Sequence, residues 1–362
     1  MTDYRYIFGT MRSEAVIEEI PLYGVFMDHE INTGGTFQGT YQLDQTGKDN
    51  ASLLDASEPG RTWVACERNG VCIWHGYLWS RVYSAQSKSV QIFAQTFEKY
   101  PEKRRIVQDT VFSATEQRNI MRSLWTQMQA DFGSNINVVV PAAFTDAVLK
   151  DLSVLSTDGK YYADIMAQLA DGDDGFDWYI NVTKDGTTYR KDLLIGYPQL
   201  GTNPFEGMVV FEYPGNITQY YFTEVMIDAG TNIFAIGEGE GSTAIIGTFE
   251  DTALITTGEV RWDVDAPHKS VNDQAAIDSL AAQEGIIRRP PMPVIKMTVK
   301  ANLEPVFGSY GLGDTCGIVI QDARFPPPGV DLHKRLLKWE LTPQSSDATE
   351  EASLIFDGDP DV

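Results

Sequence analysis

The residues best placed for chemistry in this chain are acids spaced by glycines. One such segment is Gly237-Glu238-Gly239-Glu240-Gly241. Glycine-rich loops can hold nucleotide phosphates, but this segment has neither the G-x-G-x-x-G spacing nor the lysine of a P-loop. Its two glutamates would also repel a phosphate. We therefore interpret it as a flexible turn between strands.

A second acidic loop runs from Asp171 to Asp177. Hard cations such as Ca²⁺ bind several carboxylates, and an EF-hand loop starting at Asp171 needs Gly at its sixth position and Glu at its twelfth. Phe176 and Val182 occupy those positions. The EF-hand is absent, which leaves a non-standard calcium site or, more simply, a turn between a helix and a strand.

The chain has four histidines and three cysteines: His29, His75, His268, His333, Cys66, Cys72 and Cys316. No histidine lies in an H-E-x-x-H motif, and no G-x-S-x-G motif occurs. A cysteine nucleophile would need a histidine brought near by the fold. With 51 Asp and Glu, a glycosidase pair separated by about 5–9 Å stays open. We predict no catalytic residue, no cofactor and no metal ligand.

The cysteines are expected to be free thiols, mostly buried. Asn69-Gly70 predicts a tight hairpin turn, which pairs Glu67 with Cys72 and Cys66 with Ile73. Cys66 and Cys72 then point to opposite faces of the ribbon and cannot form a disulfide.

The charge of the chain is strongly negative, at −23 with a pI near 4.5. From Asp192 to Val260 there are ten acids and no Lys or Arg, and seven more acids follow Lys338. This balance opposes a groove that grips nucleic-acid phosphates. It fits either a solvated acidic surface or an acidic channel wall along which DNA slides. Bases gather in the segment 99–105 and at Arg288-Arg289.

Periodicity predicts β structure up to residue 108, where Phe37, Gly39 and Tyr41 alternate with polar residues. Helices are predicted after Ser113, with a Ser113–Glu116 capping box, and over 160–171. A hairpin around Asp185-Gly186 follows. These elements predict an α+β domain.

The second half is predicted to be β over 206–265, with a helix opened by Ser270 and Asp273 and ended by Gly285. A further small β domain occupies 290–345, with residues 325–329 as its long loop. The acidic segment after it could add an edge strand at Leu354-Ile355-Phe356. The fold class is α+β and mainly β. The expected domains are 1–108, 109–205, 206–289, 290–345 and a tail of 346–362.

Membrane insertion is not expected, because no stretch approaches the ~18–20 apolar residues of a spanning helix. The segment Met1–Tyr6 also lacks the layout of a secretory signal. We expect synthesis and assembly in a cytoplasm.

Three segments in order resemble one protein family. They are Gly35–Thr40, which fits Gly-x-Phe-x-Gly-Thr, Trp74–Gly76, which fits aromatic-x-Gly, and Tyr100–Arg104, which fits Tyr-x-x-x-Arg. Further landmarks follow at 194–201, 213–217 and 232–241. Their order and spacing resemble the minor tail (baseplate hub) proteins of bacteriophages with long non-contractile tails.

This resemblance implies two small antiparallel β-barrel-like hub domains with an α+β domain between them. It also implies a homotrimeric ring that joins the tail tube, through its distal tail protein, to other minor tail or tip proteins. Such a protein would be located at the virion tail tip of a siphovirus and line the DNA exit channel. It would insert no segment into a membrane and bind no specific nucleic-acid sequence.

Two groups of residues are candidate sites under this interpretation. Lys103, Arg104 and Arg105 are the candidate subunit interface. Glu238, Glu240, Glu250 and Asp251 are the candidate acidic lumen. The alternatives are a tail-associated cell-wall hydrolase and a carbohydrate-binding or receptor-binding module, the latter suggested by seven Trp and sixteen Tyr.

Overall fold

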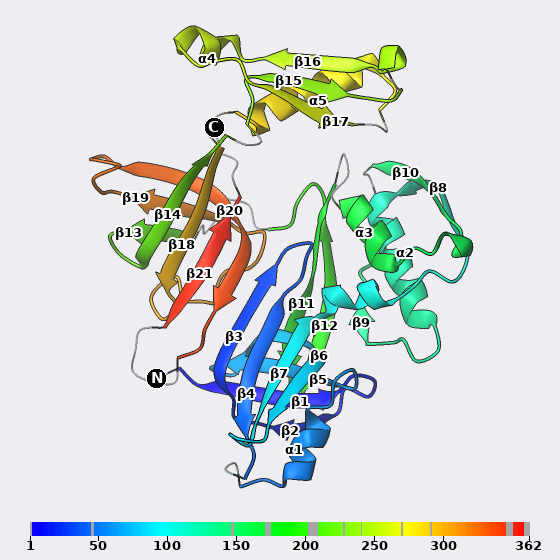
Figure 1. Ribbon diagram of the computed structural model, residues 1–362, viewed down its shortest axis with the longest axis vertical. Coiled ribbons are helices and arrows are strands. Elements are labelled where there is room, and N and C mark those ends of the chain that lie inside the picture. The colour runs from blue at the N-terminus through cyan, green and yellow to red at the C-terminus, as the bar shows by residue number, and fades with distance from the viewer. Residues whose placement is uncertain are drawn as a thin grey trace. The chain divides into compact units, whose positions relative to one another are not determined.

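A computed structural model describes residues 2–44, 47–145, 148–170, 175–201, 209–226, 229–239, 241–268, 271–289, 292–344 and 350–357 (Figure 1). Strands account for 46% of the structure and helices for 19%. The predicted mainly β fold with α+β character is confirmed. The described strands form no closed barrel, so the two barrel-like domains stay a prediction.

The chain divides into two compact units. Unit 1 comprises Met1–Phe211, Thr298–Cys316 and Arg335–Leu354, and unit 2 comprises Glu212–Met297, Gly317–Lys334 and Ile355–Val362. Each unit collects segments from several of the domains predicted above. Those domain ranges therefore stay predictions.

Unit 1 begins with an antiparallel sheet. Its elements are β1 (Tyr4–Thr10), β2 (Val16–Glu19), β3 (Tyr23–Glu30), β4 (Thr36–Gln42), α1 (Asn50–Ala56), β5 (Thr62–Arg68), β6 (Val71–Ser84), β7 (Ser89–Thr96) and the 3-10 helix η1 (Phe97–Lys103). The strand order is β3-β4-β7-β6-β5-β1-β2. On β4, Phe37, Gly39 and Tyr41 are buried and the residues between them are not, so the predicted alternation is confirmed.

The hairpin between β5 and β6 confirms the predicted turn, since Asn69 and Gly70 both have positive φ. Its register differs from the prediction. Glu67 faces Cys72 as expected, but Cys66 faces Trp74 instead of Ile73, because a bulge follows Cys66. All three cysteines are free and buried, as predicted.

The rest of unit 1 packs two helices against a hairpin. Its elements are β8 (Thr110–Glu116), α2 (Gln117–Ala130), β9 (Val138–Val139), β10 (Leu149–Val154), η2 (Ser156–Asp158), α3 (Tyr162–Ala170), β11 (Asp177–Asp185) and β12 (Thr188–Gly196). The predicted β11–β12 hairpin is confirmed, but its turn is Gly186-Thr187, one residue later than predicted, because Asp185 pairs with Thr188. Strands β8 and β10 pair with each other, and β9 is parallel to β12.

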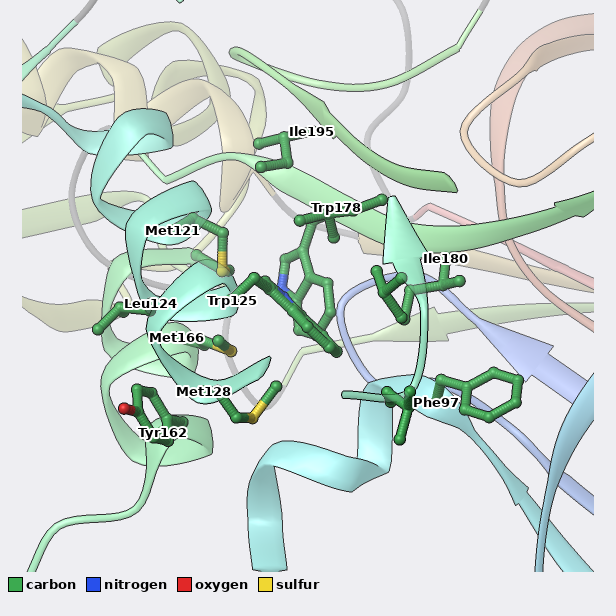
Figure 2. Close-up of a cluster of buried hydrophobic side chains, with 14 of the residues drawn as sticks. Phe97, Met121, Leu124, Trp125, Met128, Tyr162, Met166, Trp178, Ile180 and Ile195 are labelled. Carbon is green, nitrogen blue, oxygen red and sulfur yellow. The ribbon is translucent and has the colours of Figure 1, made fainter. Parts of the chain in front are cut away.

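A large hydrophobic cluster fills the space between these elements (Figure 2). The α2 side chains Leu124 and Trp125 are fully buried, and Met166 of α3 is 1% exposed. The ring of Trp125 meets that of Trp178 on β11, with centroids 6.3 Å apart. Helical spacing of apolar residues therefore predicted the buried face of α2 correctly.

The predicted start of α2 was wrong. Ser113 lies within strand β8, and the helix begins at Gln117, directly after Glu116. The carboxylate of Glu116 accepts a hydrogen bond from the backbone N–H of Asn119 at 2.9 Å. Glu116 is thus the N-cap itself, because it satisfies a free N–H of the first helical turn.

Unit 2 and the strands connected to it contain β13 (Val210–Tyr213), β14 (Ile217–Val225), β15 (Asn232–Ile236), η3 (Gly241–Thr243), β16 (Ile246–Glu250), α4 (Thr252–Thr257), β17 (Asp263–Pro267), α5 (Gln274–Ile287), β18 (Met292–Lys300), β19 (Thr315–Ile320), β20 (Val330–Leu341) and β21 (Glu351–Phe356). Strand β13 pairs with β19, and β14 with β18. A separate sheet has the order β16-β15-β17. Its Ala235 packs against Ile277 and Ala281 of α5.

Two predictions for this half need correction. Helix α5 is capped by Asp273 as predicted, but it continues through Gly285 to Ile287; Ser270 lies outside the described residues. Residues 354–356 do not form an edge strand. They belong to β21, which lies between β18 and β20 in the sheet, with Leu354 and Phe356 buried. The acidic residues around this segment are typical of an exposed tail, but its apolar residues alternate as in a strand with one buried face.

Candidate functional site

The candidate interface residues lie at the end of η1 and just after it. Lys103 is exposed, and its Nζ lies 4.9 Å from the ring centroid of Trp79. Arg104 is partly buried and forms an ion pair of 2.6 Å with Asp131 of the same chain. Arg105 is exposed. Arg104 is therefore engaged within its own chain, whereas Lys103 and Arg105 are accessible to a partner.

Of the candidate lumen residues, Glu250 is the last residue of β16, Asp251 follows it directly, and Glu238 lies two residues after the end of β15. Glu250 lies opposite Asn232, at the start of β15. Glu238 is exposed and lies six positions beyond Asn232, which is roughly 20 Å of extended chain. The structure thus brings Glu250 and Asp251 together and leaves Glu238 at the other end. Glu240 lies outside the described residues.

Two of these acids have basic partners in the chain. Glu250 pairs with Arg261 at 3.1 Å, and Asp251 pairs with Arg289 at 3.1 Å. Asp251 also caps α4, since it accepts a hydrogen bond from the N–H of Leu254 at 2.9 Å. These contacts neutralise part of the acidic excess at this end of the sheet.

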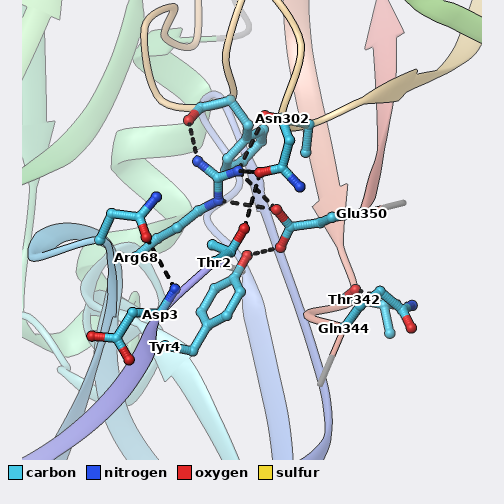
Figure 3. Close-up of polar contacts among 11 residues, drawn as sticks. Thr2, Asp3, Tyr4, Arg68, Asn302, Thr342, Gln344 and Glu350 are labelled. Atoms are coloured by element: carbon cyan, nitrogen blue, oxygen red, sulfur yellow. Dashed lines mark hydrogen bonds and ion pairs between the residues drawn. The ribbon is translucent and has the colours of Figure 1, made fainter. Parts of the chain in front are cut away.

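A buried ionic network surrounds Arg68 (Figure 3). Its guanidinium donates to Glu350 Oε2 at 2.7 Å, to the Phe307 carbonyl at 3.1 Å and to Asn302 Oδ1 at 2.6 Å. The hydroxyl of Tyr4 donates to the other oxygen of Glu350. The side chains of Arg68 and Glu350 are only 4% and 3% exposed. Almost every polar atom of the pair is satisfied, as buried charges require.

This network joins parts of unit 1 that are far apart in sequence. Tyr4 comes from β1, Arg68 from the tip of the β5–β6 hairpin, Asn302 from the segment after β18, and Glu350 from the residue before β21. Burial, and then the hydrogen bond to Glu350, raise the pKa of Tyr4, so it stays a neutral donor. The network positions the returning C-terminal strands against the N-terminal sheet.

Sequence reasoning missed this network. Arg68 is next to the predicted turn and Glu350 lies in the expected acidic tail, so neither residue was identified as part of a buried pair. No motif marks a pair separated by 282 residues. Only the buried alternation of Ala352, Leu354 and Phe356 indicated that a strand follows Glu350.

Glu98 is a second buried carboxylate, at the start of η1. It accepts hydrogen bonds from His29 Nε2 at 3.0 Å and from the N–H of Ile180 at 2.6 Å. Burial alone would raise the pKa of Glu98, but His29 and these donors hold it below its ordinary value. The carboxylate connects β3, η1 and β11 and has a structural role.

The titratable groups that could support nucleophilic catalysis are protected by burial. Burial raises the pKa of Cys72 and of Cys316 to about 12 and that of Cys66 well above its ordinary value. Thiols in this state are protonated at neutral pH and are poor nucleophiles. His75 is buried among the rings of Trp63, Phe97 and Tyr189 in unit 1, where burial lowers its pKa.

Metal and membrane sites were also sought in the described part of the chain. There, no group of three or more His, Cys, Asp or Glu is arranged to hold a metal ion. None of the helices described is both long enough and apolar enough to cross a membrane. Residues 171–174, the centre of the acidic loop considered for calcium, lie outside the described residues.

Comparison with known proteins gives a match at the level of structure. No protein-family model and no curated protein sequence matches the chain. The tail protein of Neisseria meningitidis has a TM-score of 0.62 at 12% identity, with 98% of this chain and 97% of that chain covered. The 43 kDa tail protein of prophage MuSo2 from Shewanella oneidensis has the same TM-score and identity, with 97% and 98% covered.

A third similar structure comes from E. coli. It is a component of the type VI secretion system, described as structurally similar to the bacteriophage T4 tail proteins gp27 and gp5. Its TM-score is 0.51 at 8% identity, with 97% of this chain and 76% of that chain covered. At such low identity the likeness concerns the fold. The chain therefore shares its fold with a prophage tail protein, with the Neisseria tail protein and with a component of a type VI secretion system.

Proposed function

We propose that this protein is a structural tail-hub protein of a bacteriophage. It forms a homotrimeric ring through barrel-like β domains, joins the tail tube to the tip, and lines the channel through which DNA leaves. The observation that supports this most is the shared fold with two tail proteins, one of them from a prophage, over nearly the full length of each chain. The likeness to a secretion-system component related to gp27 and gp5 agrees with a hub position.

The role is assembly and gating without chemistry. The partners are other copies of the chain, the distal tail protein at the end of the tail tube and other minor tail or tip proteins. Lys103 and Arg105 at the exposed end of η1 contact acidic surface of the next subunit, with Arg104 held between them by Asp131. Opposite charges at a subunit boundary set partner orientation and raise the rate of association.

In the ring, carboxylates such as Glu238 and Glu250, with Glu240 and Asp251 beside them in sequence, face the channel. DNA presents a dense row of phosphates, so an acidic wall repels it and prevents adhesion during passage. The repulsion acts over the Debye length, about 8–10 Å in physiological salt. It therefore affects DNA that passes close to the wall.

The first test is the mass of the purified protein in solution by light scattering, followed by imaging of the particles. We expect three times 40.3 kDa and a ring with a central opening. A particle without an opening contradicts the channel, and lysis of cell walls in a zymogram contradicts the non-enzymatic role.

The interface is tested by reversing charge. Arg105→Glu is expected to weaken trimer association at least tenfold, because it places a carboxylate where acidic surface must approach. Arg12 is also exposed, so Arg12→Glu makes the same change of charge elsewhere on unit 1. Equal mass profiles for the two variants would remove Arg105 from the interface.

A further inference from the structure

A patch on one face of the N-terminal sheet of unit 1, across β3, β4, β7 and β6, has no charged side chain, although the protein has a net charge of −23. Strand register sets its members. Phe26 on β3 lies opposite Gln38 on β4, which lies opposite Phe93 on β7. Residues directly opposite in antiparallel strands share a face. One step along, Thr40 lies opposite Gln91, and Gln91 opposite Val82 on β6.

We call this surface the neutral face. Its members are Phe26, Gln38, Thr40, Val82, Gln91 and Phe93. Val82 is 54% exposed, Gln91 is exposed and the others are half-buried. The side chains are therefore amides, a hydroxyl and apolar groups that water reaches, and none of them is ionised.

A groove crosses the neutral face. It has a volume of about 480 Å³ and is lined by Phe26, Gln38 and Phe93 together with Trp79. Trp79 is 46% exposed and lies at a bulge in β6. Lys103 covers its ring at 4.9 Å, so the groove lies next to the basic segment at the end of η1.

Charges appear only at the margins of the neutral face, among the described residues around it. Toward β20, Lys338 Nζ lies 3.3 Å from Asp28 and 3.4 Å from Glu30. At the far end of β4, Lys88 pairs with Asp44 at 3.2 Å. Lys88 and Asp44 form a one-to-one pair, whereas Lys338 is shared by Asp28, Glu30 and Glu340, so the margin toward β20 keeps an excess of negative charge.

The absence of charged side chains from the neutral face affects which partner can bind there. Two copies of a chain with a net charge of −23 repel each other, and carboxylates that meet across an interface oppose association further. Interface centres are correspondingly depleted in charged residues and enriched in aromatic ones. A second copy can therefore approach the neutral face without meeting a carboxylate at its centre.

The size of the neutral face fits the centre of an interface. Four strands span about 15 Å and seven residues of β4 extend about 20 Å, a footprint on the order of 300 Å². A standard interface buries about 800 Å² on each partner. The neutral face would supply the dry centre, and the charged margins with Lys103 and Arg105 would supply the polar rim.

We infer that the neutral face is a contact surface for a second copy of this chain. This inference rests on the proposed ring and names the surface by which one β domain meets the next subunit. The Gln38 and Gln91 amides donate and accept hydrogen bonds across it, and the groove between Phe26, Phe93 and Trp79 receives an apolar side chain of the neighbour.

The test compares two isosteric substitutions in the full chain. Gln91→Glu places a carboxylate at the centre of the neutral face, and Gln283→Glu makes the same change on the exposed side of α5. Sedimentation and light scattering over a dilution series measure association, and thermal unfolding checks the fold. We expect Gln91→Glu to weaken trimer association at least tenfold and Gln283→Glu to leave it unchanged.

Other outcomes overturn the inference in separable ways. If the wild-type chain is a trimer and neither variant changes it, the neutral face is not the contact, and the proposed function stands. If both variants weaken trimer association equally, the cause is the added net charge and not the position of that charge on the neutral face. A wild-type monomer at all concentrations overturns both proposals. Binding of a neutral polysaccharide that is lost in Trp79→Ala, with assembly intact, would assign the face to a sugar.

Discussion

Arg68 in unit 1 and Arg261 in unit 2 both pair with carboxylates, in very different surroundings. Arg68 is 4% exposed and binds Glu350 from a distant part of the sequence. Arg261 is 53% exposed and pairs with Asp263 two residues away at 2.9 Å and with Glu250 at 3.1 Å. The first joins four segments of the fold, whereas the second joins the ends of β16 and β17, the two outer strands of one small sheet.

The difference teaches that burial, and not the number of acids, decides which charges matter for the fold. An exposed pair is screened by water and salt, so its contribution is small. A buried pair has lost its hydration, and removal of one partner leaves an uncompensated charge in the interior. The net charge of −23 is a property of the surface, while a few buried carboxylates hold distant segments in register.

The largest effect is expected from Arg68→Met. The substitution keeps most of the apolar stem but removes the cation, so Glu350 stays buried without a counter-charge. We expect a loss of about 3–5 kcal/mol in the free energy of unfolding, measured by urea denaturation. The double variant Arg68→Met with Glu350→Gln should recover part of this loss, because it removes the stranded charge. No recovery would indicate that packing, and not charge, is what Arg68 contributes.

The sequence predicted the local elements of unit 1 well, because their signals are local. The Asn69-Gly70 turn, the hairpin at Gly186 and the apolar face of α2 each depend on residues within a few positions. The bulge after Cys66 could not be predicted. It depends on how β5 meets β1 and β6 at once, which a single strand does not encode.

The candidate sites were predictable only in part. Lys103 and Arg105 are accessible, as an interface requires, but the pairing of Arg104 with Asp131 depends on where η1 meets the end of α2. The neutral face had a signal in the sequence, since Gln38 and Thr40 occupy solvent-facing positions of a strand without charge. Its extent across β7 and β6 follows from strand order, which periodicity alone does not give.

A smaller effect is expected from His75→Phe, because His75 is buried without an ionic partner. Burial and the nearby Lys191 lower its pKa in the folded state. As pH falls below about 6.5, His75 binds a proton in the unfolded chain but stays neutral in the folded chain, so the free energy of unfolding declines. The slope reaches at most about 1.4 kcal/mol per pH unit.

His75→Phe should remove this component while the ring packs among Trp63, Phe97 and Tyr189. The measurement is the free energy of unfolding of wild type and variant at pH 7.5, 6.5 and 5.5. We expect the two curves to diverge as pH falls, with the variant the less sensitive. Parallel curves would mean that the folded protein protonates His75 or opens around it.

The smallest effect is expected from Arg261→Met, which repeats the first substitution in the exposed sheet of unit 2. Its partners Asp263 and Glu250 regain water when the guanidinium is removed, so no stranded charge results. We expect no measurable change in the urea midpoint, at low salt or in 0.5 M NaCl. A loss comparable to that of Arg68→Met would contradict the conclusion that burial decides the contribution of an ion pair, because it would show that the β16-β15-β17 sheet depends on its surface charges for stability. A loss confined to low salt would support that conclusion, since screening by salt would then identify the contribution as that of an exposed ion pair.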